Sequence, residues 1–578
     1  MEKGKRVAVK AKSKKRRMTP EEMENKKKLI KRTFFTIVAL LIIFAVAMIA
    51  NNYIILDNNK STNLIINNKN MTSSLKNEIL IKDNIIYLSK QDIANFFDKH
   101  IYKDEKTNKI VTTYEKKIAE IGFDDNTINI NGSDKEIYAH AIEKDGQAYL
   151  PISEMTDVYN IEMANIPETK VVTIDSLEKA QKRAIVNSNV SGKSSSNFIS
   201  KTVDRIKKGD AVIVVSSNKG YSKIRTGNGK VGIIKTSKLE NEFTIRENME
   251  EEKQIQGKVN LTWDYYSEYA SAPDRTGTKI EGVNVVSPAF FYLGKDGKLK
   301  ENVGEKGKEY IQWAKANGYK IWPMVSNAFA AKESLNITSD IMNSYEARKN
   351  LIESIISKCV EYELDGINID FENMKEEDKD MFSRFIIELE PRLKEIGMVL
   401  SVDVTAPDGG ETWSMCFDRH VIGDVADYTI FMAYDQNGSS SKKPGTTAGY
   451  NWIKLNLVKF LQTEEIEPDK LILAVPFYTR VWTTNSSGKL VGNPTVSMKD
   501  MDKTIPEGTT KEWKDDVKQN YVEYEGNNGK KQIWIEDLES LKAKISLIKD
   551  NNLAGVASWE VDMASDDVWQ MINTELNK

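Results

Sequence analysis

Nine residues at 364–372, with the sequence LDGINIDFE, constrain the fold of this chain most. Strands are depleted in Asp and Glu, so a strand-like pattern that carries this many acids indicates a chemical role. Successive side chains of an extended strand face opposite sides. The alternation predicts an apolar face and a polar face, made respectively of Ile367, Ile369 and Phe371 and of Asn368, Asp370 and Glu372.

The polar face places the Cα atoms of Asp370 and Glu372 roughly 7 Å apart along one side of the strand. Such a pair suits the mouth of a parallel barrel, where catalytic residues sit at the C-terminal strand ends. There, burial and mutual repulsion should raise the pKa of one carboxyl group enough for it to act as a general acid. The alternative is an edge strand whose solvent face happens to be acidic.

The region 255–578 alternates strand-like and helix-like patterns, which is typical of βα units and a parallel sheet. Eight such units predict a (β/α)8 barrel, with a small insertion at 483–531 where the chain is polar and contains Gly. The predicted strands are 259–263, 283–290, 320–326, 366–372, 399–405, 428–434, 471–477 and 555–560.

The N-terminal region predicts a membrane anchor. Residues 1–32 hold fourteen Lys and Arg against four Glu and predict a solvated basic tail. Residues 33–50 are eighteen residues without a charge, just long enough to cross a bilayer as a helix. The positive-inside rule then puts 1–32 in the cytoplasm and the rest of the chain outside the cell membrane, on the cell-wall side. A cleaved signal peptide, with Ala45 and Ala47 at the cleavage site, is the competing interpretation.

The segment between anchor and barrel predicts a tether and two small β-rich domains. Residues 51–76 are rich in Asn, Ser, Thr and Lys, as in a solvated tether. Residues 77–178 place short apolar runs between turn signals, and the order of TININGSDKEIYAH and KVVTIDSL resembles the copper amine oxidase N-terminal domain. Residues 184–245, with GYSKIRTGNGKVGIIKTSKL, resemble a bacterial SH3-like domain, whose relatives either bind peptidoglycan or act as spacers.

Composition excludes several classes of function. The formal net charge of −3 over 578 residues makes nucleic acid an improbable partner. The two cysteines, Cys359 and Cys416, lie among apolar neighbours and exclude a disulfide framework. The three histidines lie far apart in the sequence, so no metal site, and no copper in the N-terminal domain, is expected.

The strand at 366–372 resembles the signature D-G-x-D-x-D-x-E of glycoside hydrolase family 18. Three further strands end in motifs where this family carries related residues: MAYD at 432–435, PFYTR at 476–480 and ASWE at 557–560. Two departures are Asn368 in place of the middle acid and MVSN at 324–327 in place of Ser-x-Gly-Gly. The Asn form is similar to the subgroup of cell-wall and spore-cortex N-acetylglucosaminidases.

The resemblance implies retaining hydrolysis assisted by the 2-acetamido group of the substrate, without a cofactor. Glu372 would protonate the leaving oxygen, and Asp370 would hold the acetamido N–H. Tyr434 would bind the acetamido carbonyl oxygen, and Trp559 would form an apolar floor. Core packing of Tyr434 and Trp559 is the alternative, as is a structural ion pair of Asp435 with Arg480. The remaining substrate-binding candidates are Asp435, Asn368, Tyr478, Arg480 and Asn327.

Together these features predict a membrane-anchored extracellular hydrolase that cleaves peptidoglycan after N-acetylglucosamine. A chitinase with the same chemistry, or a lectin-like protein that binds wall glycans without cleaving them, is the alternative. The presence of Glu372 favours an enzyme over a lectin, and the anchor and accessory domains favour the cell wall over chitin.

Overall fold

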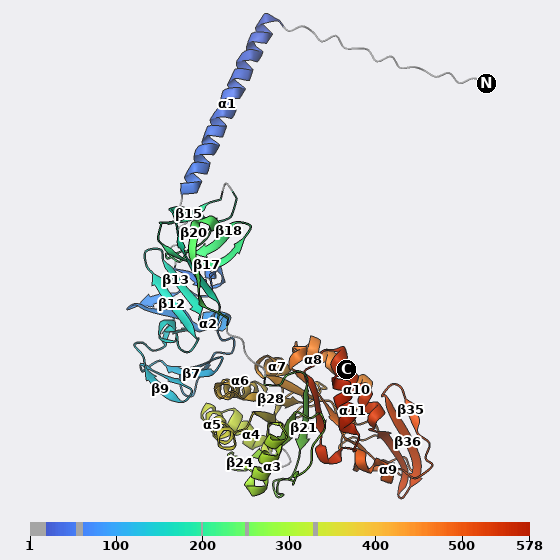
Figure 1. Cartoon of the computed structure of the whole chain (residues 1–578). Helices are drawn as coiled ribbons and strands as arrows, with labels where there is room; N and C mark the ends of the chain where they lie inside the picture. Colours follow the sequence, from blue (N-terminus) through green and yellow to red (C-terminus); the bar gives the residue numbers. More distant parts are fainter. Residues whose placement is uncertain (1–18, 54–61, 198–199, 249–253, 328–332) are drawn as a thin grey trace, which may run out of the picture. The chain divides into compact units, whose positions relative to one another are not determined.

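The structure, a computed structural model of the whole chain, describes residues 19–53, 62–197, 200–248, 254–327 and 333–578 (Figure 1). Helix α1 spans Pro20–Tyr53, and the side chains of its residues 22 and 44–53 lie outside the described part. Among the described residues, no helix combines the length and the apolarity needed to cross a bilayer. The basic tail predicted at 1–32 lies partly outside the described residues. The anchor predicted at 33–50, and the signal peptide that is its alternative, include residues 44–50, whose side chains are not described.

The chain forms two compact units, the first from residues 1–79 and 160–249 and the second from 80–159 and 250–578. Residues 77–178, predicted as one domain, are thus divided between both units. The prediction of a solvated tether at 51–76 is wrong for the second half of this segment. Leu64 and Ile65 are buried there, because their strand pairs in parallel with Val171–Ser176.

The first unit contains two sheets, of four and seven strands. The four-stranded sheet has the order β12-β13-β1-β2, and the seven-stranded sheet has the order β16-β15-β19-β18-β17-β14-β20 with its own apolar core. The SH3-like identity of 184–245 stays a prediction. The strands are β1 Asn63–Ile66, β2 Lys69–Asn70, β12 Ile161–Ile166, β13 Val171–Ser176, β14 Gln181–Val186, β15 Val190–Lys193, β16 Thr202–Ile206, β17 Ala211–Asn218, β18 Tyr221–Arg225, β19 Val231–Lys235 and β20 Leu239–Arg246.

The second unit begins with two small antiparallel sheets, of order β10-β11-β4-β3 and β5-β6-β7-β8-β9. Helix α2, Lys90–Phe96, is capped by the Ser89 side chain, which accepts from the Asp92 N–H. The strands are β3 Leu80–Lys82, β4 Ile85–Ser89, β5 Tyr102–Asp104, β6 Lys109–Tyr114, β7 Lys117–Gly122, β8 Thr127–Ile130, β9 Ser133–Glu136, β10 Ile142–Lys144 and β11 Gln147–Leu150.

The C-terminal part of the second unit is a barrel-type parallel sheet. The sheet has the order β24-β23-β26-β27-β28-β29-β30-β38-β21-β22-β25. The third predicted strand is split at Pro323 into β25, which pairs with β22, and β26, which pairs with β27. The strands are β21 Val259–Asp264, β22 Val285–Pro288, β23 Phe291–Leu293, β24 Leu299–Glu301, β25 Lys320–Ile321, β26 Met324–Ser326, β27 Gly366–Asp370, β28 Val399–Val404, β29 Tyr428–Met432, β30 Leu471–Pro476 and β38 Gly555–Trp559.

Helices surround this sheet (Figure 1). The alternation of strand and helix is incomplete, because residues 265–284, between β21 and β22, form no helix. The helices are α3 Gly304–Ala316, α4 Ser334–Met342, α5 Tyr345–Tyr362, α6 Lys379–Glu395, α7 Arg419–Val425, α8 Tyr450–Gln462, α10 Leu538–Asp550 and α11 Val568–Leu576.

The predicted alternation along β27 is confirmed. Ile367, Ile369 and Phe371 belong to the large core that includes the surrounding helices, and the ring of Phe371 stacks on Phe382 and Phe385 of α6. A second apolar core, which includes Trp263, Trp322, Ile430 and Ile472, fills the inside of the sheet. Because β27 lies between β26 and β28, it is no edge strand, and its acids face the barrel interior.

The insertion after β30 is larger than predicted, because its strands run from Tyr478 to Ile535. It has a five-stranded antiparallel sheet of order β33-β32-β37-β36-β35 and a pair formed by β31 and β34. Its own core includes Val481, Val522 and Ile533. The elements are β31 Tyr478–Arg480, β32 Trp482–Thr484, β33 Leu490–Gly492, β34 Thr495–Ser497, α9 Met501–Thr504, β35 Glu512–Lys514, β36 Gln519–Gly526 and β37 Gly529–Ile535.

A buried polar network joins the insertion to the barrel. Lys544 of α10 and Glu536 are both fully buried and form an ion pair, and Gln519 of β36 donates to Glu536. Thr446, in the loop after β29, donates to Gln519, and the N–H of Tyr450 donates to the carbonyl of Val517. The loop that leads from β29 to α8 therefore rests on the insertion.

Candidate active site

Asp370 and Glu372 form a hydrogen-bonded carboxyl pair at the C-terminal end of β27. Asp370 is the last residue of the strand and only 4% exposed, and Glu372 follows it partly buried. Burial, followed by the charge of Asp370, raises the pKa of Glu372 well above its usual range. Burial also raises the pKa of Asp370, to about 6. The pair therefore holds one proton near neutral pH, with Glu372 as the donor.

Asn327 fixes the backbone that carries Glu372. It follows β26, is buried, and binds the backbone of Glu372 twice: its Oδ1 accepts from the Glu372 N–H at 3.1 Å, and its Nδ2 donates to the Glu372 carbonyl at 2.8 Å. A third contact joins Nδ2 to Thr338 Oγ1 at 3.2 Å. The side chain predicted to bind substrate thus has its polar atoms engaged in holding the backbone of Glu372, the predicted general acid.

Asn368 lies inside the barrel and not on a surface open to substrate. Its exposed fraction is 0%, and its Oδ1 accepts from Trp263 Nε1 at 2.8 Å. Its Nδ2 donates to Asp403 Oδ1 at 2.8 Å and to Ser401 Oγ at 3.1 Å. The prediction that Asn368 binds substrate is therefore corrected: its amide is satisfied by interior side chains, and it acts on Asp403.

Asp403 of β28 is a site residue that sequence reasoning missed. It is 1% exposed, and burial together with the charge of Asp370 raises its pKa well above the usual range. The apolar pattern at 399–405 predicts a barrel strand but assigns no role to its acid. The available signal was that acid itself, in the run VLSVDV, which has the same strand-depleted residue type as the run around Asp370.

Tyr434 and Tyr478 lie beside the carboxyl pair. Their rings meet edge to face, with centroids 6.2 Å apart, and burial raises the pKa of both hydroxyl groups well above the usual range. The hydroxyl of Tyr478 donates to Asp435 Oδ1 at 2.8 Å. Asp435 is exposed and adopts a left-handed backbone, with φ 54°. Arg480 approaches the same oxygen at 3.7 Å and donates to the Asn493 carbonyl of the insertion.

Trp559 ends β38 and packs against two other aromatic residues. Its ring centroid lies 5.6 Å from that of the buried Trp263 and 5.6 Å from that of Tyr265. Trp559 itself is partly exposed, and Tyr265 is more than half exposed. The indole of Trp559 thus packs on the buried ring of Trp263 and has the ring of Tyr265 beside it. Such a partly exposed aromatic surface can bind the apolar face of a sugar. Tyr265 was not predicted.

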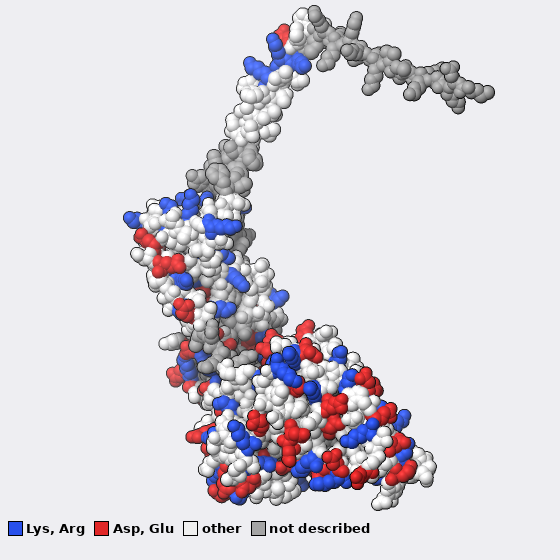
Figure 2. Space-filling model, turned by 45° about the vertical axis from the view of Figure 1, so that its right-hand side comes forward, with Lys and Arg blue, Asp and Glu red and all other residues white. Residues whose placement is uncertain are grey.

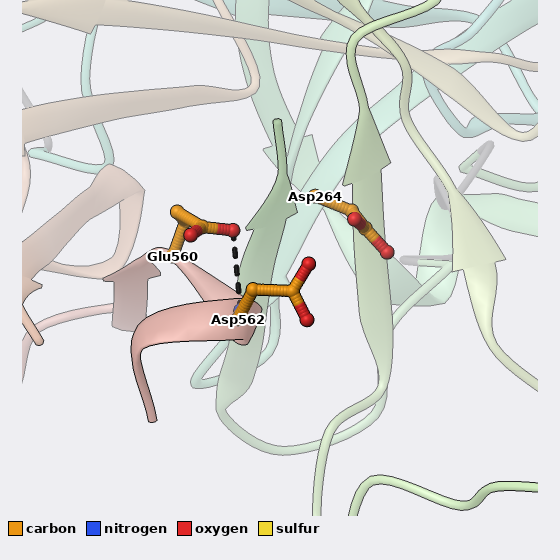
Figure 3. Close-up of side chains that lie close together, drawn as sticks. All are labelled: Asp264, Glu560 and Asp562. Carbon is orange, nitrogen blue, oxygen red and sulfur yellow. Dashed lines mark hydrogen bonds between the residues drawn. The ribbon is translucent and has the colours of Figure 1, made fainter. Parts of the chain in front are cut away.

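A second acidic cluster lies next to Trp559. It consists of Asp264, Glu560 and Asp562, whose side chains are drawn in Figure 3. One carboxylate oxygen of each lies within 4.8 Å of the others. Glu560 also accepts from the Asp562 N–H at 3.2 Å. Arg275 binds Asp264 through two nitrogens, both at 2.9 Å, and Asp562 through a third at 2.9 Å. The guanidinium supplies the positive charge here, so the donor set is that of an ion-pair network rather than of a metal site.

Charges of both signs are interspersed over the visible face of the barrel, and Figure 2 shows no broad patch of one sign there. The carboxyl groups with the most strongly raised pKa values, those of Glu372 and Asp403, lie instead at the ends of barrel strands. A protonated carboxyl group beside an ionised one, with tyrosines and a tryptophan platform around them, is the equipment of an enzyme that cleaves glycosidic bonds.

Comparison with known families agrees with this class. The model of the glycosyl hydrolases family 18 matches residues 261–564, more than half of the chain. The chain belongs to this family and is a glycoside hydrolase. The model of the copper amine oxidase N-terminal domain matches residues 46–174, which confirms that resemblance and extends it toward the N-terminus.

Individual relatives are distant. The uncharacterized glycosylase YvbX of Bacillus subtilis is 27% identical over 298 residues, which cover 50% of this chain and 84% of the relative. The cortical fragment-lytic enzyme of Bacillus subtilis is 21% identical, over 46% of this chain and 66% of the relative. A chitinase structure from Chromobacterium violaceum is 22% identical with a TM-score of 0.50, covering 56% of this chain and all of that chain. That likeness shows the barrel fold.

Proposed function

We propose that the chain is a β-N-acetylglucosaminidase that cleaves peptidoglycan after N-acetylglucosamine, with retained β configuration. The observation that carries the proposal is the Asp370–Glu372 pair, in which a shared proton sits at the mouth of the barrel beside aromatic side chains. A relative named for lysis of cortical fragments favours a cell-wall glycan over chitin.

In the proposed reaction, Glu372 donates its proton to the glycosidic oxygen while the acetamido carbonyl oxygen of the substrate attacks the anomeric carbon. The bond to the leaving sugar breaks as the oxazolinium ring forms. Asp370 stabilises the acetamido N–H and the ring charge, and the Tyr434 hydroxyl donates to the acetamido oxygen. Water then opens the ring, and Glu372 takes up the water proton. Trp559 supports the sugar from below, and Asp435, Tyr478 and Arg480 line the neighbouring wall.

The acetamido group alone does not select the sugar, because N-acetylmuramic acid also has one. The muramic 3-O-lactyl group and its peptide are bulky, and a subsite closed by Trp559 and Tyr434 should exclude them more readily than a hydroxyl group. Products should therefore end in N-acetylglucosamine. Borohydride reduction of a digest of purified sacculi, followed by mass spectrometry, should yield N-acetylglucosaminitol. Muramitol as the only product would indicate a muramidase, and activity on chitooligosaccharides alone would indicate a chitinase.

We also propose that residues 33–50 hold the enzyme at the cell membrane with the barrel outside. The support is the uncharged run of eighteen residues preceded by a basic tail. Protease added to intact cells should remove most of the protein and leave a short N-terminal remnant. Release of a protein that lacks residues 1–47 into the medium would instead indicate a cleaved signal peptide.

A further inference from the structure

The segment between β21 and β22 carries one of the two exposed aromatic rings beside the cleft, yet it has no regular secondary structure. Residues 265–284 form neither helix nor strand, although the alternation predicts a helix there. Tyr265, the first of them, is 52% exposed, and its ring centroid lies 5.6 Å from that of Trp559. Side-chain contacts must therefore fix where the Tyr265 ring lies.

Arg275 closes the first part of this segment into a loop. Its Nε and Nη2 donate to the two carboxylate oxygens of Asp264, the last residue of β21, both at 2.9 Å. Asp264 is 1% exposed, so this pair is anchored in the end of the barrel. The Arg275 carbonyl also accepts from the N–H and the hydroxyl of Thr278. Residues 265–274 thus form a loop whose ends are joined, and Tyr265 lies next to the joint.

The same guanidinium reaches the chain that continues from Trp559. Nη1 of Arg275 donates to Asp562 Oδ1 at 2.9 Å, and this contact lowers the pKa of Asp562. Asp562 lies in the short 3-10 helix Val561–Met563, which follows β38 after a single residue. β38 and β21 are neighbours that pair in parallel. Arg275 therefore bridges the ends of two adjacent barrel strands.

The bridge joins the residue before Tyr265 to the third residue after Trp559. A guanidinium presents five N–H donors in a rigid fork, so it can bind two carboxylates at once and hold them in a fixed relation. We propose that Arg275 is a positioning residue for substrate binding. Its bridge holds the ring of Tyr265 beside that of Trp559, so that both rings bind the apolar face of an N-acetylated sugar. This inference rests on the proposed function, which places the sugar on Trp559.

The test variant is Asp562→Ala, which breaks the bridge at β38 and leaves the buried pair of Arg275 and Asp264 in place. The Asp562 side chain is 53% exposed, so its loss should cost little stability. The full-length chain is titrated calorimetrically with N-acetylchitotetraose in a Glu372→Gln background, which slows cleavage. We expect the Kd to rise about threefold.

Steady-state kinetics with Glu372 restored separate positioning of the substrate from the chemical step. With an aryl β-glycoside of N-acetylchitobiose as substrate, Asp562→Ala should raise KM about threefold. Its kcat should change little, because the bridge joins β21 to β38 and does not touch β27, which carries the acid pair. A fall in kcat with unchanged KM would contradict a role in substrate binding.

A double-mutant cycle shows whether the bridge acts through Tyr265. Tyr265→Ala alone should raise the Kd about fivefold, because it removes one ring from the surface that contacts the sugar. If the bridge acts by placing that ring, Asp562→Ala should add nothing further in the Tyr265→Ala background. Losses that multiply to about fifteenfold would show that Asp562 affects binding in another way, and the proposal would be overturned.

Trypsin gives a readout that needs neither substrate nor activity. Cleavage after Arg275 requires its guanidinium to leave both carboxylates, so the rate reports opening of the bridge. The Arg275 side chain is 15% exposed, whereas Lys279, in the same segment, is exposed and serves as the internal reference. Asp562→Ala should speed cleavage after Arg275 about threefold relative to cleavage after Lys279.

The matched control is Asp274→Ala, which removes an exposed carboxylate from the same loop and leaves the bridge intact. The Asp274 Oδ1 accepts from the N–H of Thr276 at 2.9 Å. Its Kd and KM should match those of the wild type. Wild-type Kd and wild-type cleavage after Arg275 in Asp562→Ala, or an equal rise of Kd in the control, would overturn the proposal. A wild-type chain that neither binds nor cleaves N-acetylglucosamine oligomers would overturn the proposed function instead, and the trypsin rates would still decide whether the bridge holds the loop.

Discussion

Two groups of three carboxyl groups stand at the ends of the barrel strands, and they differ in whether a cation lies among them. In the first group, Arg275 binds Asp264 and Asp562. It lowers the pKa of Asp562, while burial raises the pKa of Asp264 and raises that of Glu560 to about 7. In the second group, Asp370, Glu372 and Asp403 have no such cation among the described residues. Burial raises the pKa of all three, and the charge of Asp370 raises the pKa of Glu372 and Asp403 further.

The difference teaches that the presence of a cation, and not the number of acids, distinguishes the Arg275 cluster from the proposed catalytic one. A guanidinium is always charged and fixes its partners in place. A bound proton also neutralises a carboxylate, but a carboxyl group can donate this proton to a substrate and later accept one. We therefore expect the acidic cluster without a cation to be the one that performs acid catalysis.

The largest effect is expected from Glu372→Gln, which keeps the shape of the side chain but removes the proton that it donates. Activity on peptidoglycan should fall about 10²- to 10⁴-fold. Measured kcat would give the loss, and an unchanged Tm would show that the fold is intact. Wild-type activity in this variant would contradict the assignment of the general acid.

Arg275→Gln tests the other cluster, because it leaves the buried Asp264 without its bidentate partner. Breaking a buried pair typically costs about 3 kcal/mol or more of the free energy of unfolding, which urea denaturation at pH 7 would measure. The cost should shrink toward pH 4, where protonation of Asp264 removes the unpaired charge. Equal stability of variant and wild type at pH 7 would mean that the cluster does not depend on its cation.

The dependence of wild-type activity on pH should report the ionisation of Asp370 and Glu372. Asp370 must be ionised, and its pKa is raised to about 6, so activity should fall about tenfold per pH unit below that value. On the alkaline side activity should fall only when Glu372 loses its proton, well above the usual range of a carboxyl group. Full activity at pH 4 would contradict the requirement for an ionised Asp370.

The smallest effect is expected from Asn327→Ala, which removes two hydrogen bonds to the Glu372 backbone. Lost positioning should reduce kcat by roughly 30-fold, which corresponds to about 1 kcal/mol for each of the two bonds. KM should change little, because Asn327 is engaged with backbone and Thr338 rather than with substrate. A large rise in KM with unchanged kcat would instead support the predicted contact between Asn327 and substrate.

The sequence allowed the barrel and the position of its main acid pair to be predicted, since strand alternation and strand-end motifs are local. The roles of Asn368 and Asp403 were not predictable in the same way. These two residues contact each other between β27 and β28 although they are 35 residues apart in the sequence. The periodicity within one strand does not reveal such a contact. Likewise, Arg275 comes from the segment after β21 where the alternation predicts a helix, and nothing local marks it as the partner of Asp562.

The insertion after β30 has a consequence for how such enzymes diverge. It supports the loop after β29 through Gln519 and Val517, and that loop also carries Tyr434 and Asp435. Asp370 and Asp403 belong to β27 and β28, and Glu372 follows β27; the insertion sheet pairs with neither strand. Exchange of the insertion during evolution would therefore reshape the entrance for a new glycan while leaving the acid chemistry untouched. Selection for substrate and selection for catalysis can thus proceed on separate parts of one barrel.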